Sequence, residues 1–355
     1  MTARIRADLD QLPAYVPGRT IAGALKLASN EVSAGPLPSV VKAIAAAGVE
    51  VNRYPDSHAG ALVARLAQRF GVAEEQLAVG CGSVTLCQQL LQATCTHTDE
   101  VVFAWRSFEA YPILTQVVGA RAVQVPLAEG HRLDVDAMLA AITPATRLVF
   151  ACTPNNPTGT PLHTAELRAL LDGVPSDVLV VIDEAYREFV DDPDVPDGIE
   201  VARDAWARGA HNVAVLRTFS KAYGLAGLRV GYCVAPAEVI SAVRKTFVPF
   251  GVNSLAQVAA IASLDAEDEL FARCREIVGE RARVRAELLA MGYDVPVTQA
   301  NFVWLPLGER TAEFNQHCLD HKVIVRAFLG DGARVTIGEP AENDTFLAVA
   351  RSFPR

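Results

Sequence analysis

The chain has 355 residues and a formal net charge of −9, with 51% hydrophobic and 21% charged residues. A chain of this length buries roughly three quarters of its extended surface on folding, so we expect a globular protein with one large and one smaller domain. The negative charge and the lack of a basic run argue against nucleic acid as a partner. The N-terminal stretch carries charges where a signal peptide needs apolar residues, and no apolar run reaches about 18 residues, so we expect no membrane partner.

Seven cysteines are spread along the chain without a C-x-x-C pair, at positions 81, 87, 95, 152, 233, 274 and 318. A disulfide framework or a C-x-x-C metal or redox site would show an even or clustered pattern instead. We therefore expect reduced and mostly buried thiols in a cytoplasmic protein.

Short apolar runs, several of them separated by helical patterns, fill the first two thirds of the chain. Apolar runs joined by helices are typical of a mostly parallel sheet that helices cover on both faces. We predict strands at residues 77–79, 101–103, 122–125, 148–151, 179–182, 213–216 and 230–234. The expected fold class is α/β, with a mostly parallel seven-stranded sheet.

The pattern changes after about residue 248. A long charged helical stretch ends at Gly292, and a further helical pattern and short apolar runs follow it. This mixture predicts a smaller α+β domain at the C-terminal end. We therefore expect an N-terminal arm at residues 1–28, a large domain at 29–248 and a small domain at 249–355.

Polar segments follow four of the predicted strands at the point where each strand ends. They are "GCGS" (80–83), "CTPNNPTG" (152–159), "DEAY" (183–186) and "RTFSK" (217–221). Each segment alone is ordinary turn or helix-cap chemistry. In an open parallel sheet, however, ligands bind beyond the carboxyl ends of the strands, so the four segments together predict one shared site.

These segments, together with "LASNE" (27–31), "NRYPD" (52–56) and "RVTIGEP" (334–340), resemble those of the fold-type I pyridoxal-phosphate enzymes of the class I/II aminotransferase superfamily. The resemblance extends over nearly the whole chain and includes the spacing from Lys221 to Arg229. Within the superfamily the chain is similar to the histidinol-phosphate aminotransferase branch. It looks closest to actinobacterial aromatic amino acid (phenylalanine) aminotransferases in "GCGSVTLCQQL", "AWRSFEAYP", "TFSKAYGLAGLRVGY" and "QANFVWLPLG".

The resemblance implies pyridoxal 5′-phosphate as cofactor and a catalytic set of Lys221, Asp183 and Tyr186. Lys221 would form the Schiff base with the cofactor aldehyde, which requires a neutral amine and hence a lowered pKa. Asp183 would bind the pyridine nitrogen and keep it protonated, so that the ring can accept electrons from the substrate. Asn156 and Tyr186 would donate hydrogen bonds to the 3′-oxygen of the ring.

The cofactor phosphate would lie at the start of the helix that follows "GCGS", bound by the backbone N–H groups of Ser83 and Val84 and by the helix dipole. The tyrosine in "NRYPD" would reach the cofactor of a neighbouring subunit, which implies a homodimer with shared sites; a partly buried core position is the alternative. The other implied cofactor contacts are Thr218, Ser220 and Arg229 around the phosphate, Phe108 on the ring face and Tyr54 from the neighbouring subunit.

The resemblance also implies how the substrate would be held. Arg334 would grip the carboxylate, because a guanidinium pairs with a carboxylate through two hydrogen bonds. Arg326 matches a second arginine of the histidinol-phosphate branch, although its residue type fits an exposed surface charge equally well. The full set of expected substrate contacts is Tyr15, Asn156, Arg326, Arg334, Tyr111 and Phe250.

The implied reaction moves the amino group of phenylalanine, tyrosine or tryptophan to a keto acid such as 2-oxoglutarate, with Lys221 as general base and acid. The alternative is a histidinol-phosphate aminotransferase. Three departures argue against a phosphorylated substrate: "NEVSAGP" (30–36), Val84 where many members have aspartate, and "PFGVN" (249–253) where many have a tyrosine.

Other classes of protein fit the residues less well. A decarboxylase of the same fold stays open, and a DNA-binding regulator would need an added helix-turn-helix domain. A dehydrogenase is disfavoured because "GCGS" lacks the third glycine of a dinucleotide-binding loop. His317 and His321 have a spacing that can bind zinc, but no third ligand is evident nearby, so we expect an exposed helix face and no metal.

Overall fold

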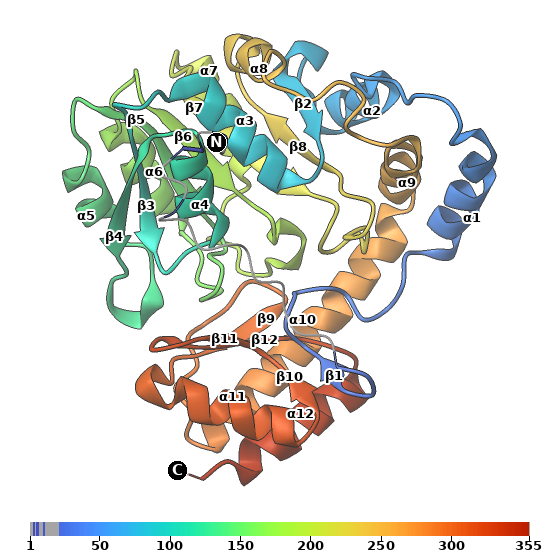
Figure 1. Cartoon of the computed structure of the whole chain (residues 1–355), viewed down its shortest axis with the longest axis vertical. Coiled ribbons are helices and arrows are strands. Elements are labelled where there is room, and N and C mark those ends of the chain that lie inside the picture. The colour runs from blue at the N-terminus through green and yellow to red at the C-terminus, as the bar shows by residue number, and fades with distance from the viewer. Residues whose placement is uncertain (1–2, 4, 7–9, 11–20, 355) are drawn as a thin grey trace.

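The computed structural model describes residues 3, 5–6, 10 and 21–354. Figure 1 shows two lobes, with the large lobe above, the small lobe below and the long helix α10 (Glu267–Ala290) running from one to the other. Most of the predicted N-terminal arm, Tyr15 included, lies outside the described residues.

The large lobe is built on one seven-stranded sheet of order β2-β8-β7-β6-β5-β3-β4. All neighbours in it are parallel except β8, which is antiparallel to both β2 and β7. The predicted mostly parallel sheet is therefore confirmed, and each predicted run overlaps one strand. The strands are β2 (Leu77–Gly80), β3 (Glu100–Trp105), β4 (Arg121–Pro126), β5 (Thr146–Cys152), β6 (Leu179–Asp183), β7 (Val213–Thr218) and β8 (Gly231–Val234).

Helices cover both faces of this sheet, and each face has its own apolar core. Successive residues of one strand point to opposite faces, so Val101 belongs to one core and Val102 to the other. One face is covered by α3 (Ser83–Thr94), α4 (Ala110–Val117) and α8 (Ala237–Val243). The opposite face is covered by α2 (Gly60–Phe70), α5 (Val135–Ala140), α6 (Thr164–Gly173) and α7 (Gly198–Ala207).

The small lobe is an α+β unit, as predicted, with a third apolar core. Its antiparallel sheet has the order β11-β12-β9, and a separate parallel pair joins β1, near the N-terminus, to β10. Its elements are β1 (Leu25–Lys26), β9 (Phe302–Leu305), α11 (Thr311–Asp320), β10 (Val323–Ile324), β11 (Arg326–Phe328), β12 (Gly332–Thr336) and α12 (Pro340–Ser352). Residues from both ends of the chain therefore build this lobe.

The helix α9 (Ser254–Asp265) lies on the large-lobe side, where it contacts α1 (Pro38–Ala47) and α2. Its residues Ala256 and Leu264 belong to a core of the large sheet. The domain boundary at residue 248 remains a prediction, and α9, which follows it, packs with the large lobe. Within residues 21–354 the short 3₁₀ helices are η2 (Gly48–Glu50), η3 (Glu74–Gln76), η4 (Glu129–His131), η5 (Arg187–Phe189) and η6 (Gly308–Arg310).

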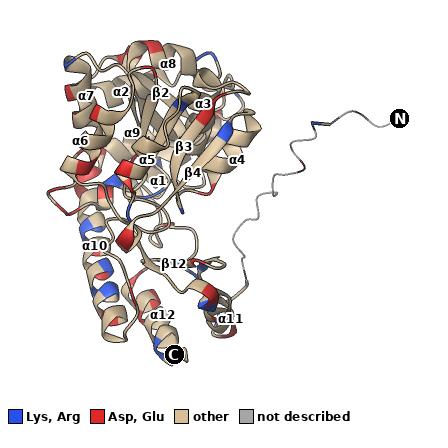
Figure 2. Ribbon diagram, turned by 90° about the vertical axis from the view of Figure 1, so that its left-hand side faces the viewer, with Lys and Arg blue, Asp and Glu red and all other residues tan. Residues whose placement is uncertain are grey.

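Charged residues of both signs are spread over the helices in Figure 2, along α10 in particular. No helix within the described part of the chain is long and apolar enough to cross a membrane. All seven cysteines are free thiols, and all but Cys81 are buried. His317 lies on α11 and His321 directly follows this helix, and the ring of His317 is 3.1 Å from the carbonyl oxygen of Val349.

Candidate active site

A cavity of about 470 Å³ lies at the carboxyl ends of β5, β6 and β7, where the small lobe meets the large lobe. Its walls come from segments far apart in the sequence, as the topology of the sheet predicts. The predicted site residues that line it are Ser83, Val84, Phe108, Asn156, Asp183, Tyr186, Thr218, Ser220, Lys221, Arg229, Arg326 and Arg334. The remaining lining residues, which the sequence did not point to as site residues, are Ala28, Ser29, Asn30, Glu109, Ala110, Ile113, Leu114, Cys152 and Ala185.

Asp183 is the last residue of β6 and carries a carboxylate at the inner end of the cavity. One carboxylate oxygen, Oδ2, accepts a hydrogen bond of 2.7 Å from the hydroxyl of Tyr111. The other oxygen, Oδ1, is buried and has no hydrogen-bond partner in the structure. Burial raises the pKa of Asp183 to about 6, and the bond from Tyr111 opposes this shift. The unpartnered Oδ1 suits a protonated ring nitrogen, because a buried carboxylate needs a donor or a cation beside it.

Lys221 lies in the turn that follows β7. Its Nζ donates a hydrogen bond of 3.0 Å to the backbone carbonyl of Ser29. Burial lowers the pKa of Lys221 to about 7, and the nearby charge of Arg334 acts in the same direction. A large share of these amines is therefore neutral near pH 7, which is the form that attacks a carbonyl carbon.

An anion-binding cup lies at the start of α3. Gly82 precedes this helix with φ of 78°, and a Cβ at this position would lie 2.5 Å from Nη2 of Arg229, so only glycine lets the guanidinium approach. Nη1 of Arg229 donates to the hydroxyl of Ser220 over 3.2 Å, and Thr218 donates to the same hydroxyl over 3.0 Å. A guanidinium, two hydroxyls and the free N–H groups of a helix start together suit a phosphate.

Arg334, on β12 of the small lobe, forms the opposite side of the cavity. Its Nη1 donates to the side-chain oxygen of Asn156, and its Nη2 donates to the carbonyl of Ala28 over 2.7 Å. The hydroxyl of Tyr186 accepts a hydrogen bond of 2.8 Å from Asn30. Burial raises the pKa of Tyr186 to about 12, so its hydroxyl keeps its proton at neutral pH and can donate it to an acceptor oxygen.

The residues present fit pyridoxal 5′-phosphate. One cavity is lined by three groups: the carbonyl-reactive amine of Lys221, the buried carboxylate of Asp183 with one unpartnered oxygen, and the phosphate cup around Arg229. These are the three partners that the aldehyde, the ring nitrogen and the phosphate of this cofactor require.

Three predicted contacts are placed elsewhere in the structure. Tyr111 is wrong as a lining residue of the substrate pocket, because it is fully buried and lies behind Asp183. Phe250 does not line the cavity of its own chain either: its backbone has a φ of 60°, and its ring stacks on Tyr54 with centroids 4.7 Å apart. Tyr54 is 84% exposed, outside its own cavity. Tyr15 lies outside the described residues.

The family described as "Aminotransferase class I and II" has a model that matches residues 22–349 of this chain. The chain belongs to this family. Among curated relatives, the aromatic amino acid aminotransferase of Rhodococcus jostii is 58% identical over 352 residues, which cover 99% of this aminotransferase and 96% of the relative. The aromatic amino acid aminotransferase of Streptomyces coelicolor is 56% identical, over 99% of this chain and 97% of its own.

The aminotransferase also resembles solved structures. That of histidinol-phosphate aminotransferase from Sinorhizobium meliloti in complex with pyridoxal-5′-phosphate has a TM-score of 0.89 and 29% identity, covering 100% of this chain and 99% of the other. The family is pyridoxal-phosphate dependent, so pyridoxal 5′-phosphate is the cofactor of this aminotransferase. The predicted fold-type I class is confirmed.

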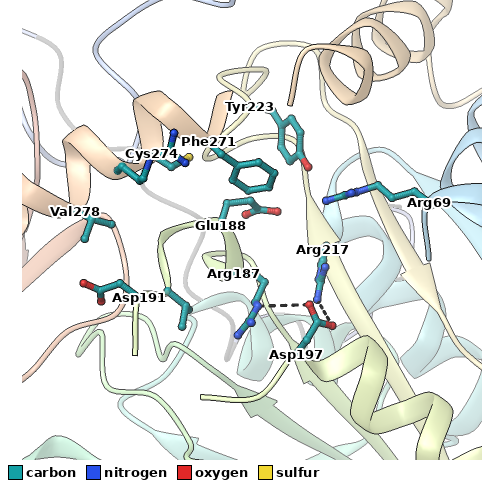
Figure 3. A pocket seen from close by; sticks show the side chains of 12 residues that line it. Arg69, Arg187, Glu188, Asp191, Asp197, Arg217, Tyr223, Phe271, Cys274 and Val278 are labelled. Atoms are coloured by element: carbon teal, nitrogen blue, oxygen red, sulfur yellow. Dashed lines mark hydrogen bonds and ion pairs between the residues drawn. The ribbon is translucent and has the colours of Figure 1, made fainter. Parts of the chain in front are cut away.

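A second cavity of about 420 Å³ lies on the other side of the ends of β6 and β7 (Figure 3). Because side chains alternate along a strand, Arg217 points into this cavity while Thr218 lines the active site. Arg217 donates to Glu184 over 2.7 Å and to Asp197 over 2.8 Å, and Figure 3 shows Arg187 on the other side of Asp197. This buried ion network anchors both strand ends from behind the active site of the aminotransferase.

Proposed function

We propose that this aminotransferase moves the amino group of aromatic amino acids, with phenylalanine as the reference substrate, to a keto acid such as 2-oxoglutarate. The observation that carries the proposal is an apolar wall of the active-site cavity, formed by Phe108, Ile113 and Leu114 on and just before α4. Arg334 in the same cavity can bind the substrate carboxylate. Burying an aromatic ring against such a wall contributes several kcal/mol, at ~25 cal/mol per Å². The names of the bacterial relatives agree with this substrate class.

Each residue of the active site then has its own role in the reaction. The bound cofactor supplies an electron sink for the electron pair released at the substrate Cα. Lys221, whose lowered pKa of about 7 leaves a large share of the amines neutral near pH 7, takes the proton from Cα and returns it as general base and acid. Asp183 keeps the ring nitrogen protonated through its open Oδ1. Arg334 and Asn156 orient the carboxylate of the substrate.

A homodimer with shared sites is part of the proposal. Tyr54 is 84% exposed and stacks on Phe250, which is itself 44% exposed. Other exposed apolar side chains lie close to these two in the sequence, namely Val49, Val51 and Val248. Exposed apolar groups gathered in this way support a protein contact surface at which Tyr54 could reach a partner's cofactor. A cytoplasmic location is also proposed, and the seven free thiols support it.

A histidinol-phosphate aminotransferase is the second candidate, because Arg326 places another cation in the cavity. The ratio of kcat/KM for phenylalanine to that for histidinol phosphate, with 2-oxoglutarate as acceptor, tests the choice. We expect the value for phenylalanine to be the larger one. A larger value for histidinol phosphate would replace the proposed substrate and leave the aminotransferase family unchanged.

A further inference from the structure

Two arginines lie on the small-lobe side of the active-site cavity. Arg334 donates hydrogen bonds to the side-chain oxygen of Asn156 and to the carbonyl of Ala28. Arg326 is paired with a carboxylate: its Nη2 lies 2.8 Å from Oε2 of Glu109, and both side chains line the cavity. The charge of Arg326 is therefore matched by a negative charge before any substrate enters.

The position of Arg326 is fixed from two sides. Glu109 immediately precedes α4 of the large lobe, whereas Arg326 begins β11 of the small lobe, so their ion pair bridges the lobes. The ring of Phe328 lies beside it, 5.7 Å from the guanidinium carbon of Arg326. A second bridging pair, between Arg106 and Asp331 at 2.5 Å, holds the same two segments together nearby. Arg326 is thus kept at the cavity wall with Glu109 against it.

We propose that Glu109 is a specificity-determining residue that disfavours amino donors with a phosphate group on the side chain. This inference rests on the proposed function, in which Arg334 already binds the one carboxylate that every amino acid substrate carries. A phosphate group on the side chain would have to displace Glu109 from Arg326 or lie beside its negative charge. At neutral pH a phosphate carries up to about two negative charges, against one for the distal carboxylate of 2-oxoglutarate. An aromatic side chain meets the apolar wall formed by Phe108, Ile113 and Leu114 and leaves the pair intact.

The pair is partly open to solvent, with 23% of the Arg326 side chain and 36% of the Glu109 side chain exposed. Solvent and salt therefore weaken the charge effect, and its size is moderate. Glu109→Gln keeps the shape of the side chain and removes the charge. It leaves Arg326 in place with a free positive charge that can pair with a phosphate.

The test compares the holoenzyme of the unaltered protein with that of Glu109→Gln, Glu109→Asp and Asp331→Asn. Each is assayed with phenylalanine and with histidinol phosphate under the same acceptor. We expect Glu109→Gln to raise the kcat/KM of histidinol phosphate relative to phenylalanine by about fivefold or more, mainly through KM, with a smaller gain at high salt. Glu109→Asp keeps the charge and should keep most of the original ratio.

Asp331→Asn is the matched control, because it removes the charge from the neighbouring bridge without freeing Arg326. Its ratio should stay near that of the unaltered protein, and Glu109→Ala replaces Glu109→Gln if the latter does not fold. An unchanged ratio in Glu109→Gln, or an equal change in Asp331→Asn, overturns the inference. The proposed function still stands in that case, provided that the unaltered holoenzyme turns over phenylalanine. No phenylalanine turnover by the unaltered holoenzyme would overturn the proposed function, and this inference with it.

Discussion

The hydroxyl of Tyr111 donates a hydrogen bond of 2.7 Å to Oδ2 of Asp183 from behind the active-site cavity. The ring of Tyr111 is fully buried and stacks on Phe150, with centroids 4.3 Å apart and planes 6° from parallel. The hydroxyl is thus held in one place, and its bond favours the charged form of Asp183 against the burial that raises the pKa. Tyr111 is therefore a positioning residue for the carboxylate that faces the cofactor.

Replacing Tyr111 with phenylalanine should raise the pKa of Asp183 further above about 6, because the carboxylate loses a donor. A hydrogen bond to a charged group contributes about 1.5–3 kcal/mol, so the shift should be on the order of one pH unit or more. The affinity of cofactor-free protein for pyridoxal phosphate is measured by absorbance at several pH values. As the pH is lowered, Asp183 becomes protonated and this affinity falls. In the variant it should begin to fall at a higher pH than in the unaltered protein. Tyr293→Phe removes a hydroxyl bond in the small lobe and serves as control. Identical pH profiles for all three proteins would contradict the role of Tyr111.

Lys221→Ala should lower turnover by roughly several orders of magnitude, because the amine that reacts with the cofactor and moves the proton is gone. In the unaltered protein, borohydride should trap the cofactor on Lys221. Because the pKa of Lys221 is lowered to about 7, the neutral amine prevails above that pH, and the rate of cofactor attachment should rise through it and then level off.

Mass spectrometry of the trapped protein identifies the modified lysine. Lys26→Ala, which removes a lysine paired with Glu31 outside the cavity, should leave the trapping on Lys221. Cofactor found on any other lysine would show that the site has been assigned to the wrong residue.

Mixing Tyr54→Ala with Lys221→Ala tests the shared site. If Tyr54 reaches across a dimer, each hybrid dimer has one site with both native residues and one site with neither. Some activity should return on mixing, given that Tyr54→Ala alone is strongly impaired. Recovery is measured after the subunits have exchanged, with each variant incubated alone as control. A monomeric and fully active unaltered enzyme would end this hypothesis.

Arg217→Met should destabilise the fold, because it leaves the buried carboxylate of Glu184 without its cation. Breaking a buried pair from one side costs about 3–5 kcal/mol, whereas removing an exposed pair costs about 0–1 kcal/mol. The urea midpoint of unfolding should fall clearly for Arg217→Met and hardly for Arg351→Met, whose partner Glu287 is exposed. Adding Glu184→Gln to Arg217→Met should restore part of the loss. Equal midpoints for the two single variants would show that the network does not anchor the strand ends.

The sheet and the convergence of its strand ends could be predicted from the sequence, because parallel strands buried on both faces appear as continuous apolar runs. The position of Tyr111 could not, since the rotation of α4 over the sheet decides whether a side chain faces the cavity or lies behind it. The contacts of Ala28 and Ser29 use backbone carbonyls, which no side-chain pattern reveals. Phe250 lies outside the cavity of its own chain, and its backbone turns with a φ of 60°, which nothing in the sequence around it indicates.

The segment around β1 contacts residues that come much later in the chain, and this has a consequence for how the protein is made. The carbonyl of Ala28 binds Arg334, which lies 306 positions later in the chain, and the carbonyl of Ser29 binds Lys221. During synthesis Ala28 leaves the ribosome long before Arg334 has been made. The segment around Ala28 therefore cannot form its native contacts with the small lobe until nearly the whole chain has emerged. The large sheet can form in the meantime, whereas the pocket is completed only in the last step. A chain stopped before β12 would therefore carry Lys221 and Asp183 on a folded sheet and still have no place for a substrate carboxylate.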